Sequence, residues 1–139
     1  MFSKSIFLGT LFSFIVLFIS AWLFYSFLAA SYFEAHSNMP PSDTMSIPFI
    51  ALGTLFQAYA MSVIFAQFHK ESHGFIASGF RFGVFMGLFV GFGIGMLMYG
   101  TSELMDLQAH LVDAAWNILY YGITGISIGV AFQIMRNKE

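Results

Sequence analysis

Charged residues are absent from four long stretches of the chain. These charge-free runs cover residues 5–33, 44–68, 82–102 and 114–135. At about 1.5 Å rise per residue, each run is long enough to cross a hydrocarbon core of roughly 30 Å as a helix. A helix that is apolar on every face needs lipid or a large protein around it. The pattern therefore predicts an all-α integral membrane protein with spans at about residues 5–33, 46–68, 76–100 and 112–135.

The segments between the predicted spans are short and polar. Residues 34–45 and 101–111 form the loops at one end, and residues 69–75 form the loop at the other end. Pro40 and Pro41 favour the end of a helix in the first of these loops. Loops of this length place consecutive helices side by side in opposite directions. Residues 1–139 are therefore predicted to form one membrane domain, an up-down-up-down four-helix bundle.

The few charged residues predict which end of the bundle faces the cytoplasm. Only 9% of the residues are charged, whereas a soluble domain carries roughly a quarter. All five basic residues fall at the end that carries both termini: Lys4, Lys70, Arg81, Arg136 and Lys138. The positive-inside rule therefore places both termini in the cytoplasm and the chain in the cytoplasmic (inner) membrane, in contact with the lipid bilayer. A net charge of −2 argues against a nucleic-acid partner held by phosphate contacts.

The two halves of the sequence are weakly similar. A shift of 74 residues aligns Gly9 with Gly83, Tyr25 with Tyr99 and His36 with His110. One interpretation is a duplicated two-helix hairpin, whose copies would be related by an axis along the membrane normal. The other is chance similarity between two helices that are both rich in phenylalanine, glycine and leucine.

Glycines recur at every fourth position of the third predicted span. The series is Gly79, Gly83, Gly87, Gly91 and Gly95. Because glycine is a poor helix former in water and lacks a Cβ atom, this spacing indicates close packing of helix backbones. Four residues turn an α-helix by about 400°, so the stripe drifts by about 40° at each step. The drift predicts either a marked crossing angle or two different neighbours.

The fourth predicted span offers a second small-residue face, at Gly122, Gly125 and Gly129. Two uses of these faces are open from the sequence. They can pack against each other inside one subunit. They can also form a seam that joins copies of the chain into a homo-oligomer or docks it into a larger membrane complex.

Polar side chains within the predicted spans are few, and Gln57, Tyr59 and Asn117 are the candidates for a polar path. Such groups usually turn inward and form hydrogen bonds between helices. The sequence places no ionisable carboxylate at mid-membrane, so a proton-coupled or cation-coupled carrier lacks its usual residue. The sequence also has no cysteine, no nucleophile with a paired base and no phosphate-binding or dinucleotide motif. We therefore expect no enzyme activity and no cofactor.

A set of histidines and carboxylates is predicted at the end opposite the termini. Glu103, Asp106, His110 and Asp113 are spaced three, four and three residues apart, and the repeat brings His36 near them. On a continuous helix these residues would share one face, and imidazole and carboxylate groups are ligands for zinc and similar cations. A solvated acidic face of an amphipathic helix has the same spacing, so a metal site is one of two interpretations.

The layout resembles that of a group of small four-span bacterial inner-membrane proteins with no established activity. The features that carry the resemblance are the aromatic end of the first span at residues 22–25, the glycine series of residues 79–95 and the glycines of residues 122–129. The resemblance implies a fold and a membrane location only.

Three functions are compatible with the sequence. The first is that of a non-catalytic structural or accessory subunit that associates through its glycine-rich helix faces. The second is that of a small-solute or ion carrier or channel formed by oligomerised hairpin repeats. The third is that of an outer-face metal-binding protein.

Overall fold

The computed structural model describes residues 3–39, 46–69 and 74–138, and apart from one isolated bridge its regular structure is helical. The elements in chain order are α1 (Lys4–Leu23), the π-helical segment η1 (Phe24–Leu28), α2 (Ala30–His36), α3 (Ile47–Phe68), α4 (Phe75–Gly87), the π-helical segment η2 (Leu88–Ile94), α5 (Gly95–Thr101) and α6 (Leu107–Arg136). Four stretches are long and apolar enough to cross a membrane: Lys4–Leu28, Ile47–Gln67, Phe75–Thr101 and Leu107–Arg136. The predicted all-α bundle with four candidate spans is therefore confirmed.

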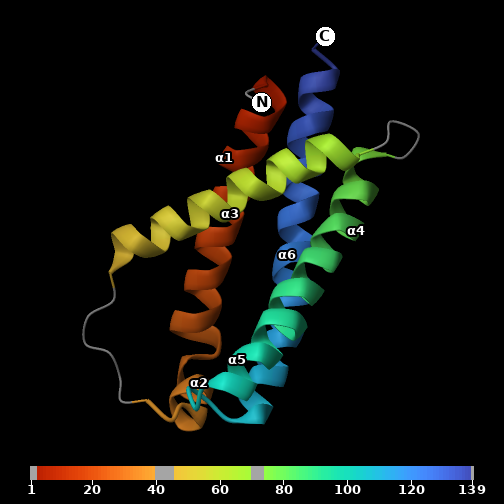
Figure 1. The fold of residues 1–139 in the computed structure, drawn as a ribbon. Coiled ribbons are helices and arrows are strands. Elements are labelled where there is room, and N and C mark those ends of the chain that lie inside the picture. The colour runs from red at the N-terminus through yellow and green to blue at the C-terminus, as the bar shows by residue number, and fades with distance from the viewer. Residues whose placement is uncertain (1–2, 40–45, 70–73, 139) are drawn as a thin grey trace.

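The longest helix, α6, is the one on which the bundle is assembled. α1 and α4 both pack along α6, and α3 packs on α1 (Figure 1). Half of the span in α6 is buried inside the protein, against 17–28% of the other three spans. The long helices alternate in direction along the chain, and both ends of the chain lie at the same end of the bundle.

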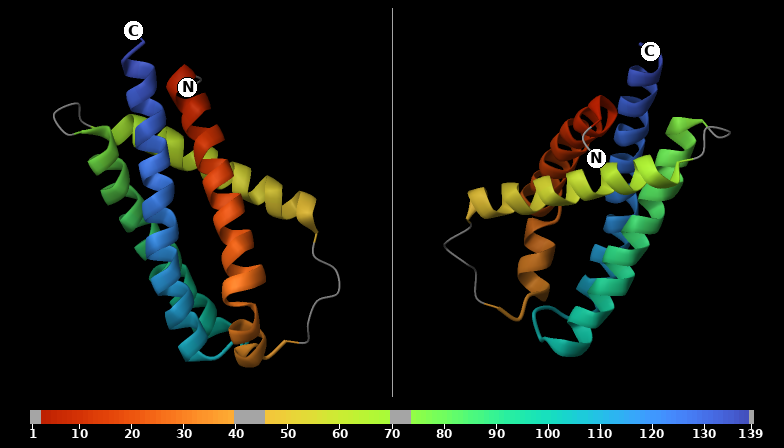
Figure 2. Two further views of the ribbon diagram at one scale, coloured as in Figure 1. Left: turned by 180° about the vertical axis from the view of Figure 1, so that it is seen from behind. Right: turned by 45° about the horizontal axis from the view of Figure 1, so that its top comes forward.

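α3 crosses the bundle obliquely instead of running along it (Figure 2). Its C-terminal half packs on the bundle, where Ala58, Met61 and Phe65 are buried. Its N-terminal half diverges from α1, and Phe49 there is 76% exposed. Because α3 is apolar around its whole circumference, the sequence does not specify which of its faces packs on a neighbour.

The contact between α4 and α6 is a seam of glycines. A Cβ atom on Gly83 would lie 2.8 Å from the carbonyl carbon of Tyr121, and one on Gly87 would lie 2.5 Å from the carbonyl oxygen of Asn117. From the other side, a Cβ atom on Gly125 would lie 2.9 Å from the Cα atom of Gly83. These distances leave no space for a side chain, so the two backbones are in direct contact.

The segment η2 keeps the glycine stripe on α6. In an α-helix, glycines spaced four residues apart are rotated around the helix axis by about 40° from one to the next. η2 begins at Leu88, and its wider turns rotate less per residue, which returns Gly91 to the interface. A Cβ atom on Gly91 would lie 2.8 Å from the Cα atom of Ala114, whereas one on Gly95 would have only its own helix within 4 Å. Four of the five glycines in the stripe therefore contact the same neighbour, α6.

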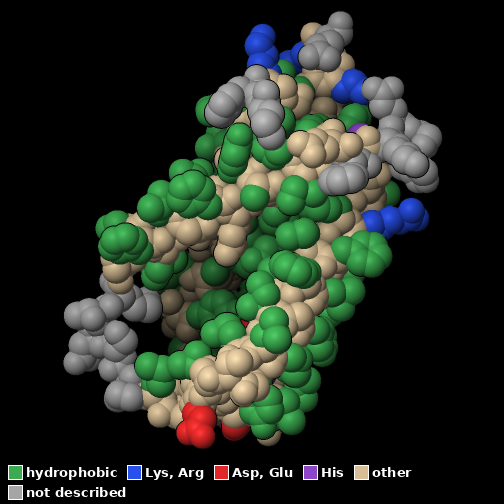
Figure 3. Space-filling view, in the orientation of Figure 1, with side chains coloured by type: hydrophobic (Ala, Val, Ile, Leu, Met, Phe, Trp, Pro, Cys, Tyr) green, Lys and Arg blue, Asp and Glu red, His purple; other side chains and the backbone are tan. Residues whose placement is uncertain are grey.

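Basic and acidic side chains lie at opposite ends of the described structure. Lys and Arg side chains lie toward the end that carries both termini, and Asp and Glu side chains show at the far end (Figure 3). The far end, formed by α2 and the loop 102–106, is called the acidic end below. The cytoplasmic location of the termini stays a prediction that rests on this distribution. Four of the charged residues lie outside the described ones: Asp43, Lys70, Glu71 and Glu139.

Labelling of single cysteines tests the orientation, since the sequence contains no cysteine to give a background. Glu103 and Asn137 are exposed at opposite ends of the bundle. We expect Glu103→Cys to react with a membrane-impermeant maleimide added to intact spheroplasts, and Asn137→Cys to react only after permeabilisation. The reverse pattern would contradict the orientation, and reaction of both variants from one side would contradict the fold.

The variant Gly83→Ala tests the glycine seam. Its new methyl group has no space between the backbones, so we expect the free energy of unfolding to fall by about 1–3 kcal/mol, the usual range for overpacked sites. Gly53→Ala is the matched control, because nothing lies within 4 Å of a Cβ atom at Gly53 in α3. The control should be neutral or gain up to about 1 kcal/mol. Unfolding of both variants in detergent, followed by circular dichroism, measures the difference, and equal stabilities would contradict the seam.

Candidate functional site

A stripe of polar side chains runs along α6 from the acidic end into the span. His110, Asp113, Asn117, Tyr121 and Thr124 follow one another at intervals of three or four residues, so they lie on one face of the helix. Four of them are buried, and Asp113 is half-buried. Asp113 follows the first residue of α6 by about 9 Å along the helix axis. Polar groups therefore reach well inside a candidate membrane span.

Asp113 is held by hydrogen-bond donors from two helices. The hydroxyl group of Tyr25 in η1 donates to Oδ1, and the Nδ2 group of Asn117 donates to Oδ2 at 3.0 Å. Among the described residues that line the space around Asp113 there is no Lys or Arg. A carboxylate in apolar surroundings is costly unless it is paired and hydrogen-bonded. Here neutral donors take the place of a basic partner.

The π turn of η1 brings Tyr25 to Asp113. The turn closes with a hydrogen bond of 2.8 Å from the Ala29 N–H to the carbonyl oxygen of Phe24. The ring of Phe24 stacks on Trp116 of α6, with centroids 3.9 Å apart and planes 5° from parallel. This stacking holds the widened turn against α6. Segments of π-helix inside α-helices are frequent at functional sites.

Two further tyrosines of α6 connect it to α1 and α3. The hydroxyl group of Tyr120 donates to the carbonyl oxygen of Leu17 in α1 at 2.9 Å. The hydroxyl group of Tyr121 donates to Oε1 of Gln57 in α3 at 3.0 Å. Gln57 and Thr54 are thus the polar side chains that α3 contributes to this region.

These side chains surround a pocket with a volume of about 370 Å³, called the polar pocket below. Its walls come from η1, α3, α6 and both η2 and α5, so both π-helical segments border it. Figure 3 shows the face of the protein hollowed beneath α3. His110 lines the pocket and is only 2% exposed, and its Nε2 atom has no hydrogen-bond partner.

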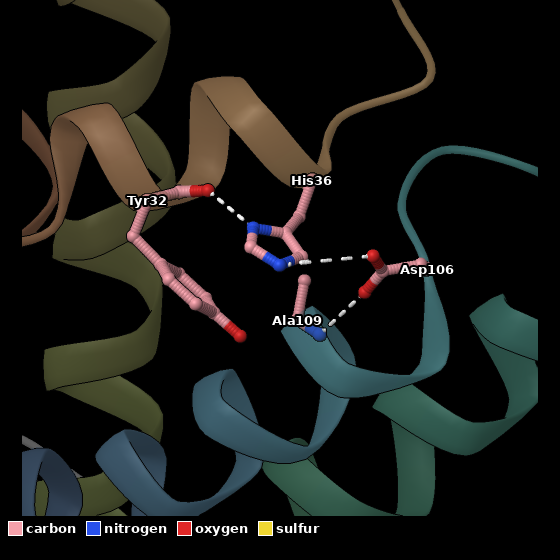
Figure 4. Close-up of polar contacts among 4 residues, drawn as sticks. All are labelled: Tyr32, His36, Asp106 and Ala109. Atoms are coloured by element: carbon pink, nitrogen blue, oxygen red, sulfur yellow. Dashed lines mark hydrogen bonds and ion pairs between the residues drawn. The ribbon is translucent and has the colours of Figure 1, made fainter.

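The acidic end is closed by contacts between α2 and the loop that precedes α6 (Figure 4). Nε2 of His36 lies 4.0 Å from Oδ2 of Asp106, and Nδ1 of His36 lies 2.8 Å from the carbonyl oxygen of Tyr32. Asp106 also caps α6, because its Oδ1 accepts a hydrogen bond of 2.8 Å from the Ala109 N–H. Backbone hydrogen bonds between the two segments complete the contact.

The five residues proposed from the sequence as metal ligands are not gathered at one point. Among the residues that the structure describes, no three His, Asp or Glu side chains are grouped so that they could hold a metal ion. The expected continuous helix from Glu103 to Asp113 was wrong, because α6 begins after Asp106 and Glu103 lies in the loop before it. The structure instead pairs His36 with Asp106 and places His110 and Asp113 in the polar pocket.

The sequence predicts a span at residues 112–135, which includes Asp113 near its start, and places no carboxylate at mid-membrane. The structure puts Asp113 in the polar pocket, about 9 Å along α6 from its first residue. The charge-free run begins one residue later, at Ala114. The polar stripe of α6 crosses that boundary without a break, and its spacing is the signal that would have identified Asp113. The approach of Tyr25 has no such signal, because it depends on a π turn. Of the three polar residues predicted in the spans, Gln57 and Asn117 line the pocket, and Tyr59 lies partly buried against the core.

Comparisons with protein families, with curated proteins and with solved structures gave no match. The four candidate spans are therefore what the structure shows of the resemblance to small bacterial membrane proteins.

The variant Tyr25→Phe tests the bond between η1 and α6. It removes the hydroxyl donor to Asp113 and keeps the ring, so we expect the free energy of unfolding to fall by about 0.6–1.7 kcal/mol, as for other hydrogen bonds between membrane helices. Tyr99→Phe is the control, since Tyr99 contacts the polar pocket only through the edge-to-face packing of its ring on His110. The control should stay within about 0.5 kcal/mol of the unsubstituted protein. Equal losses for the two variants in detergent unfolding would contradict the bond.

Proposed function

We propose that this chain is a non-catalytic, multi-pass protein of the cytoplasmic membrane whose polar pocket is the binding site of a small-solute carrier. The observation that supports this proposal is Asp113, a half-buried carboxylate inside a candidate span whose described pocket lining includes no Lys or Arg. Ionisable residues inside membrane spans are rare, and they mark substrate or ion pathways.

The chemistry of the pocket favours a cationic solute that carries N–H donors. An ionised carboxylate offers about four lone-pair sites, and Tyr25 and Asn117 each fill one of those of Asp113. The remaining lone-pair positions of Asp113 can accept hydrogen bonds from a ligand in the pocket. An ammonium group has several N–H donors and a charge of the sign that Asp113 attracts, so it suits this set of acceptors.

The accessory-subunit hypothesis has less support from the geometry. Its motivation was the set of glycine-rich faces, and those of α4 and α6 are in contact with each other inside the chain. A partner protein or a second copy of the chain would therefore have to dock elsewhere. Homo-oligomer formation stays a prediction that the mass of the purified protein in detergent tests.

Binding of radiolabelled methylammonium to the full chain in lipid nanodiscs tests the proposed function. The variant Asp113→Asn keeps the shape of the side chain and removes its charge. Since a hydrogen bond to a charged group contributes about 1.5–3 kcal/mol, we expect the affinity to fall by about 10- to 100-fold. An absence of saturable binding to the unsubstituted protein would overturn the proposal.

Asp106→Asn is the matched control for this experiment. It removes the same charge from an exposed site, and asparagine caps a helix as well as aspartate does. Methylammonium affinity should be unchanged in this variant. An equal loss in Asp106→Asn and Asp113→Asn would show that the effect of the charge is not confined to the polar pocket.

A further inference from the structure

A second cavity adjoins the polar pocket. It has a volume of about 480 Å³ and lies between α1, η1 and the N-terminal half of α3. Tyr25 and Thr54 line both cavities. These two side chains form a shared wall, so the two cavities are neighbours, and this second cavity is called the apolar groove below.

The apolar groove exists because α3 diverges from α1. Its walls include Phe18 and Trp22 on one side and Ile47 and Ile50 on the other. The hydroxyl group of Thr54 donates to the carbonyl oxygen of Ile50 within its own helix at 2.8 Å, so this wall offers no free donor there. Trp22 and Ile47 are 56% and 62% exposed, so the groove is open along its outer edge. In a bilayer that edge faces lipid chains.

The polar pocket, where the groove ends, has opposite chemical character. Asp113 is the acidic side chain of its lining, and His110 is buried there with its Nε2 unpartnered. No Lys or Arg is found among the described residues that line either cavity. A phosphate-bearing headgroup would therefore meet a carboxylate and no basic side chain, which disfavours a phospholipid.

We infer that the two cavities together bind one amphiphile, a membrane-dissolved amine with an ammonium head and a single apolar chain. The head lies in the polar pocket beside Asp113 and His110, and the chain lies in the apolar groove between α1 and α3. This inference rests on the proposed function and adds to it the class of ligand and its source in the bilayer. Charge complementarity selects the head, and burial of the chain adds affinity in proportion to its apolar area.

Photolabelling of the full chain in nanodiscs tests this inference. The probe is dodecylamine with a diazirine in its alkyl chain, and unlabelled dodecylamine, dodecanol and methylammonium are the competitors. We expect the label on the peptides that contain residues 18–26 and 47–54. We also expect dodecylamine to compete at concentrations at least about tenfold below those of dodecanol and of methylammonium. Asp113→Asn should abolish the difference between the amine and the alcohol.

A pair of tryptophan variants in α3 separates the groove from the pocket. Ile50→Trp fills the apolar groove, so we expect dodecylamine to lose its advantage while methylammonium binding is unchanged. Phe49→Trp is the control, because Phe49 is 76% exposed and does not line either cavity. It should leave both affinities unchanged.

Three outcomes overturn the inference, and they differ in what they say of the proposed function. If methylammonium binds and dodecylamine binds no more tightly, the groove has no role and the proposed function stands. If the label spreads equally over the outward face of α4, the groove holds bulk lipid only. If neither amine binds saturably, the inference and the proposed function both fail.

Discussion

The direct contact between the backbones of α4 and α6 is the constraint on which the rest of the structure depends. Lipid offers no hydrophobic gain when helices associate, so close dispersion contacts have to hold the pair together. The glycines provide that contact along one half of α6, and the last of them, Gly91, rests against Ala114. Asp113 is the next residue toward the acidic end. The polar pocket therefore lies beside this end of the seam, and Asn117 and Tyr121 contribute their backbones to the seam while they line the pocket.

The two π-helical segments turn this junction into a site. η2 holds Gly91 on α6 and then leaves Gly95 outside the seam, so the glycine seam stops before α5. η1 sits across the pocket and presents Tyr25 to Asp113. A plain α-helix in either place would shift every following side chain round the axis. Local changes in helix winding thus set where the close packing of glycines stops and which side chains line the cavity beside it.

The four spans could be predicted from the sequence because charged side chains are costly in lipid. Segments that cross a membrane therefore stand out in the sequence as long runs without charge. The spacing of Gly79, Gly83 and Gly87 in the sequence predicts the close packing that α4 makes on α6. The tilt of α3 could not be predicted, because a helix that is apolar on every side has no face whose hydrophobicity identifies the helix it packs against. The π turns could not be predicted either, since η1 depends on the stacking of Phe24 on Trp116, residues that are distant in the sequence.

The surroundings of Asp113 favour an ammonium group over the metal ion that the sequence suggested. Structural zinc sites take four ligands and calcium six or more, and both need several anionic or imidazole groups around one point. The polar pocket supplies one carboxylate and one imidazole, together with amide and phenol groups. An ammonium group carries a single positive charge, which one carboxylate balances, and neutral acceptors can complete its hydrogen bonds. The pocket is therefore better suited to an amine than to a metal ion.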